Sequence, residues 1–224
     1  MTPRTLFLTG ASSGIGAATA RAAVAAGWNV AMMARSADRL HALAQELGPQ
    51  ALALPGDATD LAQQQEAVAH AVAAFGRLDA AFANAGRGLV TPGTEAGVPD
   101  DWRGMIDLNI LALLYTARVA LPELRKTRGH LLLTGSAAGR VHIPGSIYGA
   151  TKWFVHGYGG NMSEEMRRWG GRCTVISPGM VDTPFFDEAK PDKLQPEDVA
   201  RAVVFALTQD PRAELREIHI MPTN

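Results

Sequence analysis

Two side chains of the segment YGATK have the spacing for acid–base chemistry. Tyr148 and Lys152 are four residues apart, so in a helix they lie on one face, one above the other. A phenol with an ordinary pKa near ~10 is a poor base at neutral pH, but a neighbouring ammonium stabilises the phenolate and lowers that pKa. The pair therefore predicts a general acid–base. A plain surface contact between the two is the alternative.

Ser136, in LLLTGSAAG, supplies a third group for the same chemistry. It follows an expected strand directly, at the edge of the sheet where open α/β folds bind ligands. Its hydroxyl can hold a substrate carbonyl oxygen while Tyr148 supplies the proton. Taken alone, Ser136 equally fits a serine that satisfies its own turn.

A glycine-rich turn, TGASSGIG, occupies residues 9–16 between an expected strand and an expected helix. Gly10, Gly14 and Gly16 allow a sharp turn and a close approach of the backbone to a pyrophosphate, which the helix N-terminus also attracts. The turn predicts a dinucleotide site, with a glycine turn that binds nothing as the alternative. A P-loop is less favoured, because no Gly-Lys-Ser/Thr follows.

Two residues after later strands bear on which dinucleotide is bound. The strand at 29–34 is followed by Arg35, where an acidic residue would accept from a ribose hydroxyl and an arginine instead favours a 2′-phosphate. Arg35 therefore predicts NADP(H), with NADPH preferred over NADH, unless it is an ordinary surface charge. Asp57, in PGDATD, either accepts from the adenine amino group or belongs to a turn.

These residues need a framework of alternating elements, and the hydrophobic pattern supplies one. Short apolar runs predict strands at 5–9, 29–34, 51–55, 79–83, 130–134, 172–177 and 217–221. Longer amphipathic segments predict helices at 14–26, 36–47, 61–75, 102–125, 148–169 and 197–208. The alternation predicts an α/β fold: a doubly wound, seven-stranded parallel sheet with helices on both faces, Rossmann-like.

Composition limits the classes of function. The chain has 224 residues, a net charge of -1 and 47% hydrophobic residues, which predicts one globular domain over residues 1–224 and no basic face for nucleic acid. No window was expected to approach the ~20 apolar residues of a membrane span. The single cysteine, Cys173, suits a reducing compartment, so we expect a cytoplasmic protein. The histidines have no metal-ligand spacing, and we expect no metal.

In this order, the glycine turn, Asn-Ala-Gly, Ser, Tyr-x-x-x-Lys and Pro-Gly resemble the short-chain dehydrogenase/reductase family over essentially the whole chain. The resemblance implies an NADP-dependent oxidoreductase acting on a CH–OH group. It implies a catalytic set of Asn109, Ser136, Tyr148 and Lys152. It implies a cofactor set of Gly10, Ser12, Ser13, Gly14, Ile15, Gly16, Arg35, Asp57, Asn84, Ala85, Gly86, Tyr148, Lys152, Pro178, Gly179 and Thr183.

The resemblance also implies roles. Asn109 bends a long helix and holds a water that relays protons through Lys152, and Thr183 contacts the carboxamide of the nicotinamide. Relatives pair their long helices between subunits, which implies a homodimer or homotetramer.

Three features depart from the family pattern. Ala83 stands where a second Asn often precedes Asn-Ala-Gly. Ser136 and Tyr148 are twelve residues apart rather than thirteen, so the loop between them is expected to be tighter. The segment 183–195, where relatives carry a substrate lid, is short and suggests an open site for a small substrate.

The expected function is hydride transfer between NADP(H) and a small carbonyl or alcohol. The C-terminal EIHIMPT is similar to relatives that act on short hydroxy acids or on amino-acid alcohols such as serine. Arg87 is either a partner for a substrate carboxylate or a solvated loop residue, and Trp153, Phe185 and Phe186 either line an apolar pocket or belong to the core. The alternative function is a nonenzymatic NADP(H)-binding redox sensor, and such proteins commonly lose Tyr or Lys.

Overall fold

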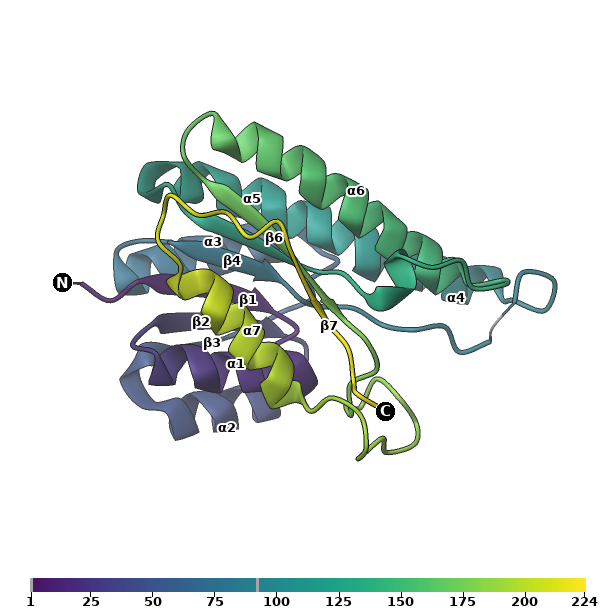
Figure 1. The fold of residues 1–224 in the computed structure, drawn as a ribbon. Helices are drawn as coiled ribbons and strands as arrows, with labels where there is room; N and C mark the ends of the chain where they lie inside the picture. The colour runs from purple at the N-terminus through teal and green to yellow at the C-terminus, as the bar shows by residue number, and fades with distance from the viewer. Residues whose placement is uncertain (1, 92) are drawn as a thin grey trace.

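The computed structural model describes residues 2–91 and 93–224, and in these residues the chain forms one twisted sheet between two layers of helices (Figure 1). The seven strands pair in the order β3-β2-β1-β4-β5-β6-β7, and every pairing is parallel. The strands are β1 (Thr5–Thr9), β2 (Asn29–Ala34), β3 (Ala51–Pro55), β4 (Ala80–Ala83), β5 (His130–Thr134), β6 (Arg172–Pro178) and β7 (Glu217–Ile220). The predicted doubly wound fold is confirmed.

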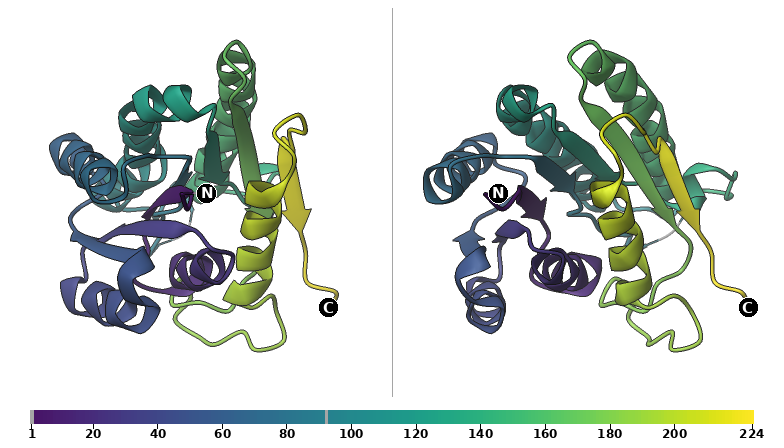
Figure 2. Two further views of the ribbon diagram at one scale, coloured as in Figure 1. Left: turned by 90° about the vertical axis from the view of Figure 1, so that its left-hand side faces the viewer. Right: turned by 60° about the vertical axis from the view of Figure 1, so that its left-hand side comes forward.

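Alternate strand residues face opposite helical layers, because successive side chains of a strand point to opposite faces. Leu6, Leu8 and their neighbours pack under α1 (Gly14–Ala25), α2 (Ala37–Leu47) and α7 (Pro196–Thr208). Phe7 and its neighbours pack under α3 (Leu61–Phe75), α5 (Ala112–Thr127) and α6 (Ile147–Arg167). Figure 2 shows the sheet between these layers from two further directions.

Element boundaries agree closely with the sequence pattern except in one helix. The pattern predicted a single helix over 102–125, whereas the chain forms α4 (Pro99–Ile106), a π-helical turn η2 (Asp107–Leu111) and then α5. The helix begins earlier because Pro99 occupies the first turn, where its missing N–H costs nothing, and two acidic residues follow it. A π turn has no hydrophobic period of its own, so the pattern did not indicate it.

The continuous helical stretch Pro99–Thr127 also corrects an expectation about apolar segments. It is 29 residues long, with a window of mean hydropathy 1.4, and so by length and composition alone it is able to cross a membrane. The expectation that no window approaches this threshold was wrong. Of that window 39% is buried, and Ala117 and Leu124 of α5 belong to the core under the sheet. Packing against the sheet requires an apolar helix in any case, so its length and hydropathy are weak evidence for a membrane span.

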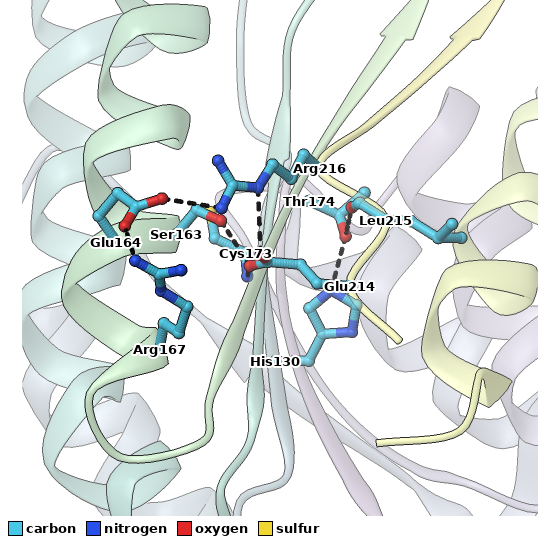
Figure 3. A network of polar contacts seen from close by, with 9 residues as sticks. All are labelled: His130, Ser163, Glu164, Arg167, Cys173, Thr174, Glu214, Leu215 and Arg216. Atoms are coloured by element: carbon cyan, nitrogen blue, oxygen red, sulfur yellow. Dashed lines mark hydrogen bonds and ion pairs between the residues drawn. The ribbon is translucent and has the colours of Figure 1, made fainter. Parts of the chain in front are cut away.

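A polar network fixes the segment that leads into β7 (Figure 3). The Glu214 carboxylate accepts from Ser163 Oγ of α6 and from the Cys173 amide of β6. Thr174 Oγ1 donates to the Leu215 carbonyl and lies 2.7 Å from Nε2 of His130. Burial lowers the pKa of His130 to about 3, so this ring stays neutral. The network holds α6, β6 and β7 together, and all three elements reach the site described next.

Candidate active site

The glycine turn packs so tightly that side chains are excluded. A Cβ at Gly16 would lie 2.2 Å from the Gly10 carbonyl oxygen, and one at Gly10 would lie 2.9 Å from Cα of Ala85. Gly10 and Gly14 also have positive φ values of 68° and 50°. The turn is therefore a bare-backbone surface at the carboxyl end of β1, and its shape fits the pyrophosphate of a dinucleotide.

The N-terminus of α1 lies in this turn with no side-chain cap. Ser13 is the capping residue and makes no capping hydrogen bond, and the first turn holds no acidic residue. Ser12, Ser13 and Ile15 are all partly exposed. Backbone N–H groups without an intrahelical partner, together with the positive end of the helix dipole, form an anion site that suits a phosphate.

Asn84 ties three strand ends together. Its Nδ2 donates to the carbonyls of Thr9 and Gly10, at 3.1 and 3.3 Å, and its Oδ1 accepts from Thr134 Oγ1 at 3.2 Å. The Ala85 amide donates to Thr9 Oγ1 at 3.3 Å. The Asn-Ala-Gly element thus lies directly beside the glycine turn, in the position that the resemblance implies for residues next to the cofactor.

Tyr148 and Lys152 share one face of the first turns of α6, as their spacing predicts. Nζ of Lys152 lies 5.7 Å from the centre of the Tyr148 ring and donates to the Thr134 carbonyl at 2.8 Å. A Cβ at Gly86 would lie 3.8 Å from the same Nζ and 3.3 Å from Asn109 Oδ1. Both side chains therefore reach the carboxyl ends of β4 and β5, where the Asn-Ala-Gly element and Ser136 also lie.

Burial shifts the pKa of both Lys152 and Tyr148. It lowers the pKa of Lys152 to about 8. It raises the pKa of Tyr148, against the opposite effect of a hydrogen bond with Ser136. The pKa of Tyr148 therefore lies above its ordinary value and not below it, because the loss of solvation outweighs the hydrogen bond with Ser136. A raised pKa keeps the phenol protonated at neutral pH, which is the form that donates a proton.

Ser136 occupies the loop after β5 and is 9% exposed. Its Oγ accepts from the Ala138 amide at 3.1 Å and caps the short helix η3 (Ala137–Gly139). Ser136 therefore has both properties considered from the sequence: it satisfies its own turn and it adjoins Tyr148. A hydroxyl accepts from the amide and keeps its own proton for another acceptor.

Asn109 lies in the π-helical turn and is 1% exposed. Its Oδ1 accepts from the Arg87 amide, and its Nδ2 donates to the Arg87 carbonyl, both at 2.9 Å. Nδ2 also lies 3.2 Å from Thr151 Oγ1 of α6. The expected irregularity in the helix at Asn109 is confirmed. The side chain joins the loop after β4 to the helix that carries Tyr148.

The loop between β6 and α7 closes the other side of the site (Figure 2). Thr183 contacts the glycine turn, since a Cβ at Gly14 would lie 3.2 Å from its Cγ2. Pro178 ends β6, and the Gly179 amide donates to the Ile220 carbonyl at 2.7 Å. These three residues therefore lie at the end of the sheet near the expected nicotinamide position.

Phe185 of the same loop lies against Tyr148. The centres of its ring and the Tyr148 ring are 5.5 Å apart, and a Cβ at Gly88 would lie 3.1 Å from its Cζ. It is 42% exposed. Of the three aromatic residues considered from the sequence, Phe185 is the one that touches a catalytic side chain, and Phe186 packs on Phe185. Trp153 stacks on His142 instead.

Arg35 and Asp57, the two residues expected to bear on which dinucleotide is bound, differ in their contacts within the protein. Arg35 follows β2, is exposed, and makes no ion pair or side-chain hydrogen bond within residues 2–91 and 93–224. Asp57 Oδ1 instead accepts from the amide and hydroxyl of Thr59, at 2.9 and 2.8 Å. Asp57 thus forms the turn that was its alternative interpretation.

Arg87 is paired within the protein. Its guanidinium forms an ion pair with Asp101, whose side chain is 9% exposed and whose other oxygen accepts from the Val90 amide at 2.9 Å. The geometry does not support Arg87 as a free partner for a substrate carboxylate, whereas its side chain remains 37% exposed, in part as expected for a solvated loop arginine. In the described part of the chain, no group of three or more His, Cys, Asp or Glu side chains forms a candidate metal site.

Several functional contacts left no mark in the sequence. The Thr134 carbonyl that accepts from Lys152 is a backbone group, which a sequence motif does not show. Asp101 and Thr151 come from distant segments, and only the fold brings them to Arg87 and Asn109. His156 was not expected to contact the site; its position four residues after Lys152 is the one sequence signal that could have indicated it, and the side chain is buried.

The chain matches the short chain dehydrogenase family over residues 4–194. It is 37% identical, over 228 aligned positions, to an uncharacterized oxidoreductase of Staphylococcus aureus (strain MRSA252), with 99% of this chain and 98% of that protein covered.

Two solved structures share the fold closely. Serine dehydrogenase from Escherichia coli has a TM-score of 0.89 and 30% identity, covering 97% of each chain. An alcohol dehydrogenase from the archaeon Thermococcus sibiricus, complexed with 5-hydroxy-NADP, has a TM-score of 0.90 and 29% identity, covering 98% of this chain and 97% of that one.

Proposed function

Because the chain belongs to the short-chain dehydrogenase family of oxidoreductases, we propose that it transfers hydride between NADP(H) and a small carbonyl or alcohol substrate. One observation carries the proposal. Tyr148, Lys152 and Ser136 converge at the carboxyl ends of β4 and β5, beside a glycine turn shaped for a dinucleotide. Ligands of open α/β sheets bind at this edge.

The chain offers a continuous surface for the cofactor. Gly10, Gly14, Gly16 and the N-terminus of α1 would hold the pyrophosphate, and Arg35 would hold a 2′-phosphate. Lys152 and the Asn84 segment would flank the ribose and nicotinamide. When bound, the nicotinamide supplies or accepts the hydride. The alcohol dehydrogenase structure complexed with 5-hydroxy-NADP supports a nicotinamide dinucleotide at this surface, and Arg35 is the residue that favours NADP over NAD.

The protein's own groups handle the proton. In carbonyl reduction the Tyr148 phenol donates its proton to the substrate oxygen, while the Ser136 hydroxyl donates a hydrogen bond to the same oxygen. The Lys152 ammonium, 5.7 Å from the Tyr148 ring, stabilises the phenolate that remains. Alcohol oxidation reverses each step, with the phenolate as base.

The residues around Tyr148 bear on the polarity and charge of the substrate. Phe185 presents an apolar ring beside the phenol, and Arg87 is held by Asp101. A short hydroxy acid, expected from the C-terminal resemblance and from the similarity to a serine dehydrogenase, needs a cation other than Arg87 for its carboxylate. A panel of ketones, aldehydes and β-hydroxy acids, followed at the reduced-nicotinamide absorbance, identifies the preferred class.

The decisive test replaces Tyr148 by Phe. Tyr148→Phe removes the acid–base proton and leaves the ring in place, so turnover is expected to fall by about 10²-fold or more while NADPH binding is retained. Calorimetry with NADPH is the control for folding and binding. A variant with unchanged turnover would remove Tyr148 from the mechanism. NADPH binding without turnover in the wild-type protein would favour the redox-sensor alternative.

We also propose a homodimer or homotetramer located in the cytoplasm. A groove between α5 and α6 exposes apolar side chains with charges of both signs. The groove is lined by Leu114, Arg118, Leu121, Pro122, Arg125, Tyr158, Met162 and Glu165. A second copy related by a two-fold axis can cover its leucines and set its arginines near Glu165 of the other copy.

A further inference from the structure

A buried polar cluster that the proposed mechanism does not use lies next to Ser136. Its centre is His156 of α6, which is 9% exposed. Nε2 of His156 lies 3.1 Å from the Ser136 carbonyl oxygen and 3.5 Å from Ser177 Oγ of β6. Nδ1 lies 3.5 Å from a carboxylate oxygen of Glu217, the first residue of β7.

His156 shares a helix face with the catalytic pair. Tyr148, Lys152 and His156 follow one another at four-residue intervals, so their side chains point the same way from α6. The first of these side chains makes a hydrogen bond with the Ser136 side chain, and the third reaches the Ser136 main chain. The helix face thus holds Ser136 at two points.

Glycines on both sides of Ser136 allow this contact. A Cβ at Gly135 would lie 3.3 Å from Nε2 of His156, and one at Gly139 would lie 2.6 Å from its Cδ2. The loop from Gly135 to Gly139 therefore rests directly on the imidazole. A bulky residue at either glycine would move the loop or the ring.

The hydrogen-bond partners determine which ring nitrogen carries the proton. A carbonyl only accepts, so Nε2–H donates to Ser136, and in the neutral ring Nδ1 is unprotonated. The groups that face the ring are Glu217, Arg140, Lys152 and the hydroxyl of Ser177. Burial lowers the pKa of His156, and Arg140 and Lys152 act in the same direction, against Glu217 and the hydrogen bond to Ser136. The ring is therefore neutral at physiological pH.

Glu217 is itself held in place. Arg140, just after η3, donates from Nε to Glu217 Oε1 at 3.3 Å and forms a second, shorter contact through Nη2. Glu217 thereby links the strand β7 to the loop that begins at Ser136. Its carboxylate lies beside His156 Nδ1, which has no hydrogen-bond partner among the described residues, so Glu217 places a negative charge near the ring without a hydrogen bond to it.

We propose that His156 is a positioning residue for the reaction: its Nε2–H fixes the Ser136 main chain, and through it the direction of the Ser136 hydroxyl. The proposal rests on the proposed function, because Ser136 is meaningful only where a substrate oxygen binds. Core packing alone would make His156 important for folding but not for the use of the Ser136 hydroxyl.

A double-mutant cycle separates these two roles. His156→Leu is expected to lower kcat about tenfold, with the Kd for NADPH unchanged, because the hydroxyl loses its orientation. In the Ser136→Ala background the same substitution is expected to change kcat less than about twofold, since no hydroxyl remains to orient. An equal loss in both backgrounds, or no loss in the first, overturns the proposal.

A conservative variant keeps the test decisive if His156→Leu folds poorly. His156→Gln retains an amide donor and is expected to recover most of kcat. Equal kcat in His156→Gln and His156→Leu would contradict the role of the donor. His70→Leu, an exposed histidine of α3, is the matched control and is expected to be silent.

A spectroscopic readout is independent of turnover. Proton–nitrogen correlation spectra of histidine-labelled protein are expected to show His156 as the Nε2–H tautomer, and a protonated Nδ1 in a neutral ring overturns the contact with Ser136. If the wild-type protein bound NADPH but turned over no substrate, the proposed function would fail. This spectrum would still decide the contact.

Discussion

At the scale of single residues, burial disfavours the charged forms of both Lys152 and Tyr148. Lys152 is 5% exposed, and its ammonium has one side-chain hydrogen bond within the described residues, to the Thr134 carbonyl. A buried ammonium is costly unless it is paired, so the folded protein retains this charge at the expense of stability. In the mechanism that we propose, the same ammonium supports the phenolate of Tyr148, whose ring it faces.

This cost predicts a pH-dependent stability. The pKa of Lys152 is about 8 in the folded protein, against 10.5 for the ordinary side chain, so between these values the unfolded chain binds more protons and stability rises with pH. The penalty is fully present below pH 8 and is lost as the pH rises toward 10.5. From about pH 7 to about pH 10, the wild type should gain ~2 kcal/mol in unfolding free energy relative to Lys152→Met. Urea denaturation of both proteins measures this, and parallel pH curves would contradict it.

Arg35 carries the prediction of nucleotide choice. Its guanidinium is exposed at the end of β2 and is not engaged by another described side chain, so it is free to pair with a 2′-phosphate. Arg35→Ala is expected to weaken NADPH binding about 10- to 100-fold and to change NADH binding little. Calorimetry with both nucleotides measures the ratio. Arg21→Ala removes the same charge from an arginine held by Glu46 and is the control. Equal losses for NADPH and NADH would contradict the 2′-phosphate contact.

At the scale of elements, the π-helical turn is the feature that joins the helix layer to the site. It directs Asn109 inward, so that one amide satisfies both backbone groups of Arg87 and reaches α6. β4 ends at Ala83, so the backbone N–H and C=O of Arg87 have no neighbouring strand to pair with. The Asn109 side chain pairs with them instead. Through Asn109, the loop after β4 is therefore held by the helical stretch Pro99–Thr127 and is joined to α6.

Removing that side chain should affect stability and activity together. Asn109→Leu leaves the Arg87 N–H and C=O without partners, which is expected to cost about 2–4 kcal/mol of unfolding free energy and to lower kcat. Asn109→Asp keeps the acceptor for the Arg87 N–H and is expected to lose less. Chemical denaturation and turnover of the two variants test this, and a fully stable Asn109→Leu would show that the amide is dispensable.

At the scale of the whole molecule, the layer that contains α5 and α6 has apolar side chains along a surface groove. The long stretch Pro99–Thr127 buries one side in the core, whereas Leu114 and Leu121 of α5 line a surface groove with Tyr158 and Met162 of α6. A second copy of the chain would cover this groove. The apolar character of the whole helix would then have two causes, the sheet on one side and the proposed subunit contact on the other.

The assembly is tested by adding charge to the groove. The double substitution Leu114→Glu with Leu121→Glu is expected to give monomers by light scattering, because charges in an apolar contact lose solvation. The exposed pair Ala73→Glu with Ala74→Glu on α3 adds the same charge elsewhere and is expected to leave the oligomer unchanged. A wild-type protein that is already monomeric would contradict the proposed assembly.

The sequence by itself determined what depends on local spacing. The strands, the helices, the glycine turn and the shared face of Tyr148 and Lys152 all follow from periodicity and from residues near one another in the chain. Seven short apolar runs between amphipathic segments leave few folds other than a doubly wound parallel sheet.

Only the tertiary structure decided how each group is solvated and paired, because pairing joins segments far apart in the sequence. Burial lowers the pKa of Lys152 and raises that of Tyr148, against the hydrogen bond with Ser136. Arg87 meets Asp101, and His156 meets the Ser136 carbonyl and Glu217, only once the strands align. Charge and hydrogen-bond energies depend on these distances and on the loss of water, and neither is encoded in residue spacing.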